Sequence, residues 1–296
     1  MTVQTIFADL GLLALQRLVI DHQLPVMFER SLRLQSGTVE SRRALFTIPV
    51  AALDVVDIAE VLHICRTMSS PAAHQKSIEQ FFSTAQFIHF GFECSGADRI
   101  GKCYLERTAQ QATAHKNAGQ LDFLGFKWSM VHCEIAVVSK YKNLGPVKWN
   151  QIQQAMLSKF SNSGEQQAAD LLLRHFAPKN IAVPTAPKNL AAHTKSAAYT
   201  KSADVDDLRL LQVTEEGSHR TSHDLNVYAA DLKVEHLADC LEGINQQFQG
   251  DALALKDWMA THGHQTVGHL SMGRGRHNNP FVTVYHSADI NQLSSQ

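Results

Sequence analysis

The segments FIHFGFEC (Phe87–Cys94) and IGKCYLER (Ile100–Arg107) decide the fold. Both are strand-like and the connection between them is short, so they are typical of an antiparallel hairpin. Four similar pairs occur along the chain, at Glu29–Gln35 with Arg42–Pro49, Phe123–Met130 with Glu134–Tyr141, Leu208–Thr214 with Asp224–Ala230, and Thr266–Gly273 with Phe281–Ser287. Ten such strands indicate one large antiparallel sheet, which removes its edges by closing into a barrel.

The stretches that precede the hairpins have helical patterns. They span Ile6–His22, Ala51–Ser83, Thr108–Ala118, Trp149–Phe176 and Val234–His262. Helices that pack outside a barrel need an apolar outer face on every strand, whereas the lumen can be polar. We therefore predict an α+β fold over residues 1–296 as a single domain. It is a ten-stranded antiparallel β-barrel built from five helix–hairpin repeats, with the helices outside.

The second quoted segment shows this polarity directly. Lys102, Tyr104 and Glu106 share one face of the strand, because side chains alternate along it. Cys103 and Leu105 share the other face. A lysine and a glutamate are costly against a helix layer, but they are tolerated in a solvated or ligand-filled lumen where they find partners. We expect the polar face to line the lumen.

We expect a monomeric, cytoplasmic protein with no nucleic-acid or membrane partner. The 296 residues include 27 Lys and Arg and 28 Asp and Glu, without the basic excess of nucleic-acid-binding proteins. The apolar runs are too short to span a bilayer, and the N-terminal stretch resembles an amphipathic helix rather than a signal peptide. Five scattered cysteines form no CxxC pair, which is typical of reduced thiols. The segment Ala177–Val205 predicts a long loop beside the barrel.

Four of the five tyrosines lie in the second strands of predicted hairpins, as Tyr104, Tyr141, Tyr228 and Tyr285. Tyrosine is a good strand former, so these positions can reflect packing alone. They also fit a ring of aromatic faces around a cavity, where the π electrons stabilise a cation and the rings exclude water. We favour the second interpretation, because carbocation chemistry needs such a ring.

Basic side chains fall near the same level of the predicted barrel. They are Arg42, Arg43, Lys102, Lys127 and Lys140. Any one of them can be a solvated residue at a barrel rim, but the apolar neighbours of Lys102 favour a functional role for it. Several cations converging on a lumen would bind a polyanion such as diphosphate and stabilise the charge of a leaving group.

The sequence carries no strong signal for a protein-held metal or a nucleotide loop. His262, His264 and His269 lie close together, but no cysteine or carboxylate completes a ligand set at a useful spacing. The segment Gly273–Gly275 (GRG) follows a strand without opening a helix, which favours a hairpin turn over a phosphate loop. We expect no metal bound by these histidines.

In their order and spacing, these motifs resemble the ABBA, or PT-barrel, prenyltransferases, and most closely the cyanobactin-type enzymes that modify ribosomal peptides. VESRRALF (Val39–Phe46) is similar to the family's strand ending in Ser-Arg-Phe, and its diphosphate-binding arginine points to Arg42. GKCYLER is similar to a strand with Lys-x-His, where Lys102 matches the lysine and Tyr104 replaces the histidine. Two more segments resemble family motifs: LGFKW (Leu124–Trp128) resembles I-G-F-D-F, with Lys127 in place of the acidic residue, and RHFAPK (Arg174–Lys179) resembles Q-H-F-P-K.

The resemblance implies transfer of an isoprenyl group, expected to be dimethylallyl, from its diphosphate to a nucleophilic side chain of a ribosomally made, cyclic peptide. Arg42, Lys102 and Lys140 would bind the diphosphate, assisted by a Mg²⁺ ion. Glu29 would be the catalytic residue that takes the proton of the acceptor. The prenyl cation would be shielded by Tyr104, Tyr141, Tyr228 and Tyr285.

Two other functions fit the same pattern. One is a prenyltransferase that acts on small aromatic molecules such as indole or tryptophan, on the same barrel. The other is a non-catalytic barrel that binds a peptide or a lipid. The pair of Glu29 and Lys102 argues against the binding protein, because such a protein has no need of both residues.

Overall fold

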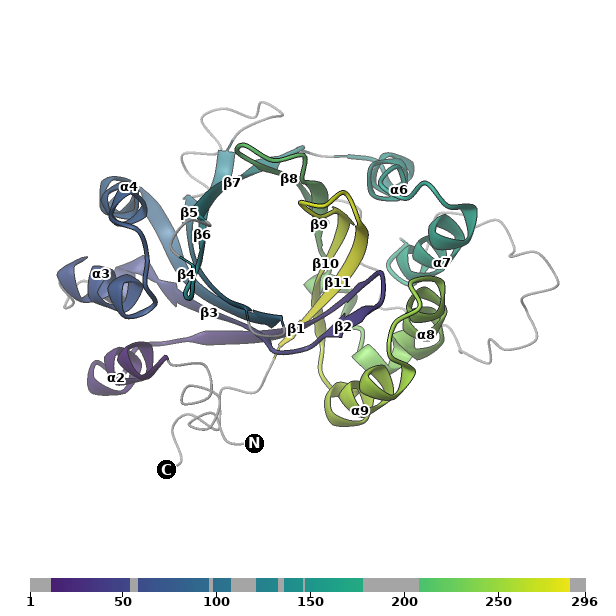
Figure 1. The fold of residues 1–296 in the computed structure, drawn as a ribbon, viewed down its shortest axis with the longest axis horizontal. Coiled ribbons are helices and arrows are strands. Elements are labelled where there is room, and N and C mark those ends of the chain that lie inside the picture. The colour runs from purple at the N-terminus through teal and green to yellow at the C-terminus, as the bar shows by residue number, and fades with distance from the viewer. Residues whose placement is uncertain are drawn as a thin grey trace.

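The structure, a computed structural model, describes residues 12–53, 58–95, 98–107, 121–132, 136–145, 147–177 and 208–287. One antiparallel sheet forms a closed barrel at its centre (Figure 1). The strands are β1 (Met27–Gln35), β2 (Thr38–Glu40), β3 (Arg43–Pro49), β4 (Ala85–Ser95), β5 (Asp98–Arg107), β6 (Leu121–Ser129), β7 (Ala136–Asn143), β8 (Arg209–Glu215), β9 (Thr221–Asn226), β10 (Val267–Arg274) and β11 (Pro280–Ser287). The predicted ten-stranded antiparallel barrel is confirmed.

Neighbouring strands follow the chain order, except that β1 closes the barrel by pairing with β11. The eleventh strand, β2, is a short addition that the sequence pattern did not predict. The chain turns at Gly37, whose φ of +72° suits glycine, and β2 then pairs with the end of β1. From there the chain returns into β3, which pairs with the start of β1 at Met27–Arg30.

The described helices lie outside the barrel, as expected (Figure 1). They are α2 (Leu13–Asp21), α3 (Ile58–Thr67), α4 (Ala72–Phe82), α6 (Trp149–Leu157), α7 (Ser163–Arg174), α8 (Ala238–Gln247) and α9 (Ala252–His262), with the 3-10 helices η1 (Val50–Leu53), η3 (Tyr228–Ala230) and η4 (Val234–Leu237). In Figure 1, α2 to α4 flank one side of the barrel and α6 to α9 flank the other. None of these helices is long and apolar enough to cross a membrane.

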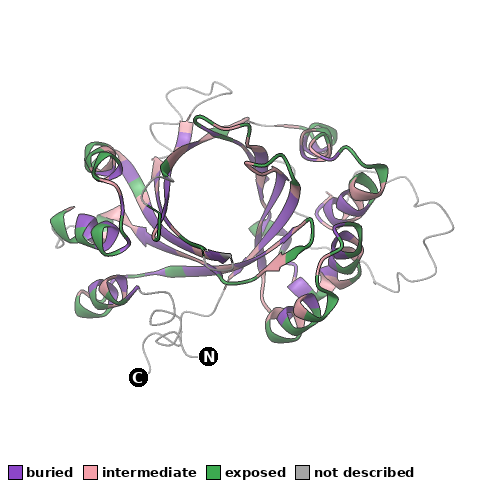
Figure 2. Cartoon of the chain, viewed as in Figure 1, coloured by how far each residue is buried: buried purple, intermediate pink, exposed green. Residues whose placement is uncertain are grey.

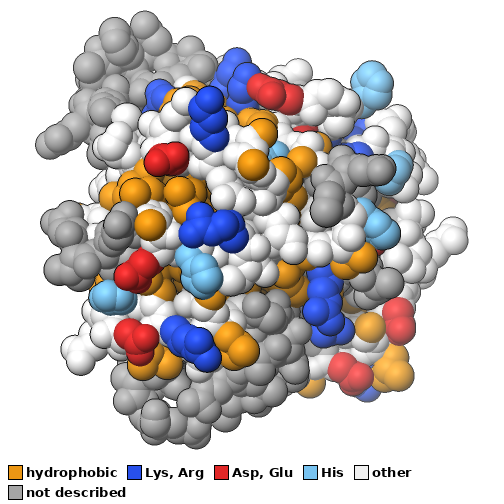
Figure 3. All heavy atoms as spheres, turned by 60° about the vertical axis from the view of Figure 1, so that its left-hand side comes forward, with side chains coloured by type: hydrophobic (Ala, Val, Ile, Leu, Met, Phe, Trp, Pro, Cys, Tyr) orange, Lys and Arg blue, Asp and Glu red, His pale blue; other side chains and the backbone are white. Residues whose placement is uncertain are grey.

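Apolar residues on the outer faces of the strands build two cores, one under each group of helices. In β1, Leu32 and Leu34 are buried beneath the second group, while Ser31 and Arg33 line the lumen. The two faces arise because side chains alternate along a strand. Figure 2 shows the buried strands surrounded by helices that are exposed on their outer sides. On the face in Figure 3, acidic, basic and apolar side chains are interspersed, in keeping with the net charge of −1.

Three predicted helical stretches are interrupted in the structure. Ala51–Ser83 divides at Ser69, which has a φ of +61°, and at Pro71, which directly precedes α4. Val234–His262 divides at Gln249, with a φ of +55°, and Trp149–Phe176 divides between α6 and α7. The predicted helix Thr108–Ala118 lies outside the described residues, as do most of the predicted loop and the start of the first predicted helix.

One predicted strand ends earlier than expected. The pattern predicted Asp224–Ala230, but β9 stops at Asn226 and Tyr228 lies in the 3-10 turn η3. The Asn226 side chain accepts a hydrogen bond from the Tyr228 backbone N–H (3.2 Å) and so stabilises the turn. Tyr228 is therefore at the end of the barrel rather than in its wall.

Candidate active site

A cavity of about 280 Å³ occupies the lumen. The end that we call the mouth is lined by apolar side chains, among them Met27, Phe87 and Phe123, and Met27 is half-exposed. The opposite end is polar and carries Arg43 and Lys102. The inner strand faces thus build a cavity that has apolar side chains at its mouth and Arg43 and Lys102 at its floor.

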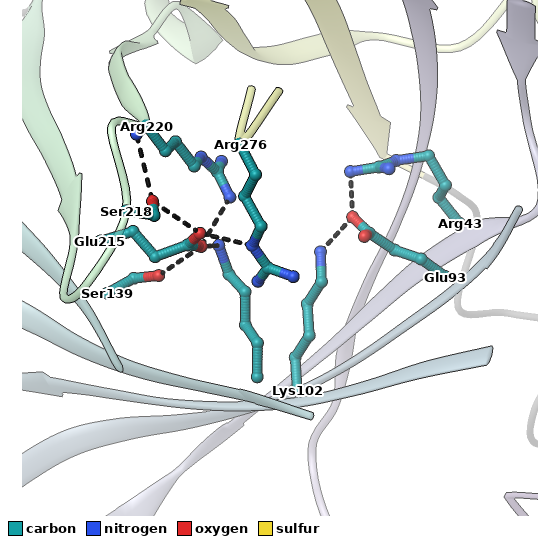
Figure 4. Close-up of polar contacts among 9 residues, drawn as sticks. Arg43, Glu93, Lys102, Ser139, Glu215, Ser218, Arg220 and Arg276 are labelled. Atoms are coloured by element: carbon teal, nitrogen blue, oxygen red, sulfur yellow. Dashed lines mark hydrogen bonds and ion pairs between the residues drawn. The ribbon is translucent and has the colours of Figure 1, made fainter. Parts of the chain in front are cut away.

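The first charged cluster at the floor is centred on Glu93 (Figure 4). Its carboxylate forms ion pairs with Arg43 and Lys102, which reach it from β3 and β5. Arg43 also donates from Nε to the Ser31 hydroxyl (3.1 Å). Gly91 faces Lys102 across the sheet, and a Cβ atom there would lie 3.1 Å from the Cβ and Cδ of the lysine. The glycine therefore lets the lysine lie across β4 towards Glu93.

The second charged cluster is centred on Glu215, whose side chain is fully buried. Its carboxylate accepts hydrogen bonds from Lys127 (3.2 Å), Ser139 (3.3 Å), Arg220 (3.1 Å) and Arg276 (2.6 Å). Figure 4 shows this cluster facing the Glu93 cluster across the lumen. We call the two clusters together, with their five cations and two carboxylates, the basic layer.

The basic layer has more cations than carboxylates, and the pKa values reflect this excess. Burial lowers the pKa of Lys102 to about 7, and Arg43 adds to that shift although Glu93 opposes it. Burial and the neighbouring Arg220 also hold the pKa of Lys127 well below its usual range. An anion between the two clusters would offset the charge and favour the protonated lysines.

A ring of aromatic side chains separates the basic layer from the mouth. Tyr104, Tyr141 and Tyr285, which we call the tyrosine ring, line both the main cavity and a smaller one of about 30 Å³ beneath it. The centroids of Tyr104 and Tyr141 are 5.8 Å apart in an edge-to-face contact. A Cβ atom on Gly125 would lie 2.6 Å from the Tyr104 ring, so the glycine makes room for it. Three aromatic faces thus surround the space above the cations.

Glu29 lies on the mouth side of the tyrosine ring, with its side chain largely buried. The Tyr228 hydroxyl donates to Glu29 Oε1 (2.5 Å), and His269 Nε2 is 3.8 Å from the same oxygen. His269 Nδ1 is 3.1 Å from Asp224 Oδ1. Burial alone would lower the pKa of His269, but the bond with Asp224 and the charge of Glu29 raise it to about 9. The imidazolium therefore places a positive charge beside Glu29.

A second polar network lies on the opposite wall near the mouth. Arg209 donates to Glu106 (3.0 Å) and Asp122 (2.5 Å), and its guanidinium lies 5.2 Å from the Phe123 ring centroid. His89 Nε2 is 3.4 Å from Glu106. These contacts fix polar groups around the apolar entrance.

The structure brings together most of the side chains that the sequence pointed to. The cavity is lined by Glu29, Lys102, Tyr104, Tyr141, Tyr228 and Tyr285. Tyr228 is 39% exposed at the mouth, so it lies apart from the tyrosine ring and contacts Glu29 instead.

Arg42 and Lys140 are not among the cavity residues. Arg42 is exposed, and its neighbour Arg43 is the arginine that faces the lumen, because adjacent residues of a strand point to opposite faces. Lys140 has the opposite orientation to Tyr141 for the same reason. Its side chain is 44% exposed and pairs with Glu216 (2.7 Å). Of the three residues predicted to bind diphosphate, Lys102 alone lines the described cavity.

Several charged residues at or beside the cavity were not among those that the sequence analysis singled out. Glu93 shares a strand face with His89 and Gly91, opposite the apolar Ile88, Phe90 and Phe92, so the alternation is a signal that could have placed Glu93 in the lumen. Arg220 and Arg276 lie in turns after β8 and β10. His269 was considered only as a metal ligand, whereas the structure places it beside Glu29.

The carboxylates of the basic layer do not fit a protein-held Mg²⁺ ion. Within the described ranges, no group of three or more His, Cys, Asp or Glu side chains could hold a metal ion. Glu93 and Glu215 each accept from lysine and arginine side chains instead. A Mg²⁺ ion would therefore take its ligands from a bound diphosphate and water.

No protein-family model and no curated protein matches the sequence. Among solved structures, the chain is similar to 5-dimethylallyltryptophan synthase from Streptomyces coelicolor, with a TM-score of 0.54 and 14% identity over 92% of this chain and 83% of that one. It is also similar to 6-dimethylallyltryptophan synthase from Micromonospora olivasterospora in complex with DMASPP and Trp, with a TM-score of 0.53 and 13% identity over 88% and 81%. The shared feature is the ABBA fold, a closed ten-stranded antiparallel barrel with outer helices.

Proposed function

We propose that this chain is an ABBA-type prenyltransferase that moves an isoprenyl group, taken to be dimethylallyl, from its diphosphate to a nucleophilic acceptor. One arrangement carries the proposal: a closed lumen holds the basic layer at its floor, the tyrosine ring above it and the carboxylate of Glu29 beyond the ring. These three parts match an anionic leaving group, an allylic cation and a proton to be removed. A fold likeness alone would not assign this chemistry.

The diphosphate would bind between the two charged clusters, with Arg43 and Lys102 on one side and Lys127, Arg220 and Arg276 on the other. The bond between the allylic carbon and the diphosphate oxygen breaks, and its electron pair stays on that oxygen. The cations stabilise the added negative charge because they are already oriented in a water-poor lumen. An assisting Mg²⁺ ion would arrive with the diphosphate.

The allylic cation would face Tyr104, Tyr141 and Tyr285. Their π faces stabilise positive charge, and their bulk keeps water from attacking the cation. The acceptor attacks from the mouth side and forms the new carbon bond. Glu29 then takes the proton that the acceptor loses, while Tyr228 and His269 hold the carboxylate in place.

We propose a side chain of a ribosomally made, cyclic peptide as the acceptor. The proposal rests on the sequence resemblance and on the exposed side chains at the mouth, Met27 and Tyr228, which a large acceptor could reach. A small aromatic acceptor is the second candidate, since one solved structure of this fold holds Trp. The apolar entrance and the polar network of Arg209 and Glu106 suit an indole with a charged tail.

A single assay tests the activity and separates these candidates. The protein is incubated with dimethylallyl diphosphate, with and without Mg²⁺, and with either cyclic peptides or free tryptophan and indole. We expect a mass gain of one dimethylallyl group on the acceptor. A gain on the small molecules but not on the peptides would replace the peptide by the second candidate. Donor binding without transfer to any acceptor would favour a non-catalytic binding barrel.

A further inference from the structure

Glu93 places a negative charge where the proposed diphosphate would bind. It faces the lumen from β4, directly opposite Arg43 and diagonal to Lys102 in the sheet. Both cations form ion pairs with it. Burial alone would raise the pKa of Glu93, but Arg43 and Lys102 hold it well below its usual range. The carboxylate is therefore charged and occupies the cations that the leaving group needs.

The second carboxylate of the basic layer has a different environment. Glu215 is fully buried, receives two hydroxyl hydrogen bonds from Ser139 and Ser218, and lines neither cavity. Glu93 lines both cavities and its side chain is 18% exposed. A ligand in the lumen can thus approach Glu93, whereas Glu215 serves to hold the strands and cations around it.

Arg43 does not depend on Glu93 alone for its position. Its Nε donates to Ser31 (3.1 Å), and its Nη1 lies 3.6 Å from Glu40 Oε2. The guanidinium can therefore form some of its hydrogen bonds with a new anion while its contacts with Ser31 and Glu40 hold it in place. The ammonium of Lys102 is at the end of a flexible stem and can also move between two anions.

We propose that Glu93 is an internal competitor of the diphosphate in this site. In the empty lumen its carboxylate pairs with Arg43 and Lys102. When the donor binds, both cations pair with the diphosphate of the donor instead. The carboxylate and the diphosphate then repel each other at close range, so that donor and product diphosphate bind less tightly than the cations alone would allow. Glu93 thus sets the affinity for the leaving group and favours its release after transfer. The inference rests on the proposed donor site.

The test measures binding of inorganic diphosphate, which has no isoprenyl group and needs no acceptor. Glu93→Gln keeps the shape of the side chain but removes its charge. We expect this variant to bind diphosphate at least ~10-fold more tightly than the wild type, by calorimetry, and to show stronger product inhibition. Diphosphate should also raise its melting temperature by more than that of the wild type, because the freed cations gain a partner.

Glu106→Gln is the matched control. It removes one carboxylate from the same cavity, but at the mouth, where Glu106 pairs with Arg209 and His89. We expect its diphosphate affinity to stay within about 3-fold of the wild type, since screening weakens interactions over the longer distance. An equal tightening in both variants would assign the effect to the total charge of the lumen and overturn a specific role for Glu93.

Glu93→Asp is a second variant, which serves as the test if Glu93→Gln does not fold. Glu93→Asp keeps the charge but cannot reach both cations equally well, so we expect an intermediate tightening of about 3-fold. Unchanged or weaker diphosphate binding in the folded variants would overturn the competitor role while leaving the donor site of the wild type in place. Absence of diphosphate binding in the wild type and the variants alike would overturn the donor site itself, and with it this inference.

Discussion

Glu29 is fixed from two parts of the chain that are distant in sequence. The Tyr228 hydroxyl comes from η3 and the His269 ring from β10, and both approach Oε1 of the carboxylate. A fixed base loses less entropy when it accepts a proton in the transition state. Tyr228 lies outside the tyrosine ring, and in the proposed mechanism its hydroxyl positions Glu29.

Replacement of Glu29 by glutamine is expected to affect proton transfer alone. The amide keeps the hydrogen bond to Tyr228 but cannot accept the proton, and general-base catalysis is worth ~100- to 10,000-fold in rate. We expect Glu29→Gln to transfer the prenyl group at least ~100-fold more slowly in single turnovers, with unchanged diphosphate affinity. A rate within a few fold of the wild type would remove Glu29 from the mechanism.

Lys102 should make donor binding depend on pH. Its pKa is lowered to about 7, so it is mostly protonated below pH 7 and loses its charge as the pH rises above that value. Diphosphate binds the protonated form, and each pH unit above 7 then costs about 1.4 kcal/mol for protonation. We expect the dissociation constant of diphosphate to rise between pH 7 and pH 9 by calorimetry.

Lys102→Met is the comparison for this pH profile. The variant should bind diphosphate more weakly at pH 6.5 and show a shallower rise, while the ionisation of diphosphate itself is the same for both proteins. Identical slopes in the two proteins would show that another group causes the pH dependence.

The sequence could not predict, for every residue of this site, on which face of its strand the side chain lies. In β5, the polar residues Lys102, Tyr104 and Glu106 alternate with apolar residues, so the pattern predicted that Lys102 faces the lumen. Two arginines are adjacent where β3 begins, and nothing in the local sequence distinguishes Arg42 from Arg43. A shift of one residue reverses the face, and the structure directs Arg43 rather than Arg42 into the lumen.

Glycines in the barrel wall leave space for side chains that neighbouring strands direct into the lumen. The Tyr104 ring lies against Gly125 of β6, where the absence of a side chain leaves space for it. The tyrosine ring therefore depends on β6 as well as on the strands that carry the tyrosines. At this scale the sequence predicted the strands of β4, β5 and β6, but not these close approaches, which depend on pairing between strands.

A methyl group at Gly125 is expected to disturb the shield. In Gly125→Ala, the new Cβ would lie 2.6 Å from the Tyr104 ring and 3.4 Å from Tyr141, so the ring must move. We expect the variant to fold, and water to reach the cation more often. The ratio of dimethylallyl alcohol to prenylated product should rise several-fold, measured by chromatography.

Gly243→Ala in α8 serves as the control for Gly125→Ala. A Cβ atom there meets nothing within 4 Å, and alanine is a better helix former than glycine by roughly 0.5–1 kcal/mol. Its ratio of alcohol to product should equal that of the wild type. The shield role of the ring would be contradicted if Gly125→Ala also kept that ratio.

The closed barrel relates residues that no local pattern connects. Pairing of β1 with β11 runs from Glu29 opposite Ser287 to Gln35 opposite Phe281. Closure brings the two charged clusters to face each other, although Glu93 and Glu215 are far apart in the chain. The sequence predicted closure, because an open sheet of this size would leave exposed edges. It could not predict that these two clusters face each other, because their positions depend on the stagger of every strand between Glu93 and Glu215.

Closure predicts that a proline in β11 is far more damaging than one in β2. Val284 is buried and pairs with Leu32 of β1 on one side and Leu270 of β10 on the other. Proline at this position has no backbone N–H, so it removes one hydrogen bond between β11 and one of these two strands. We expect Val284→Pro to lower the free energy of unfolding by on the order of 3 kcal/mol in urea, with loss of diphosphate binding. Thr38→Pro lies in the exposed, three-residue β2 and should cost about 1 kcal/mol or less. Equal urea midpoints of unfolding for the two variants would mean that β11 is an open edge of the sheet and that its pairing with β1 does not close the lumen.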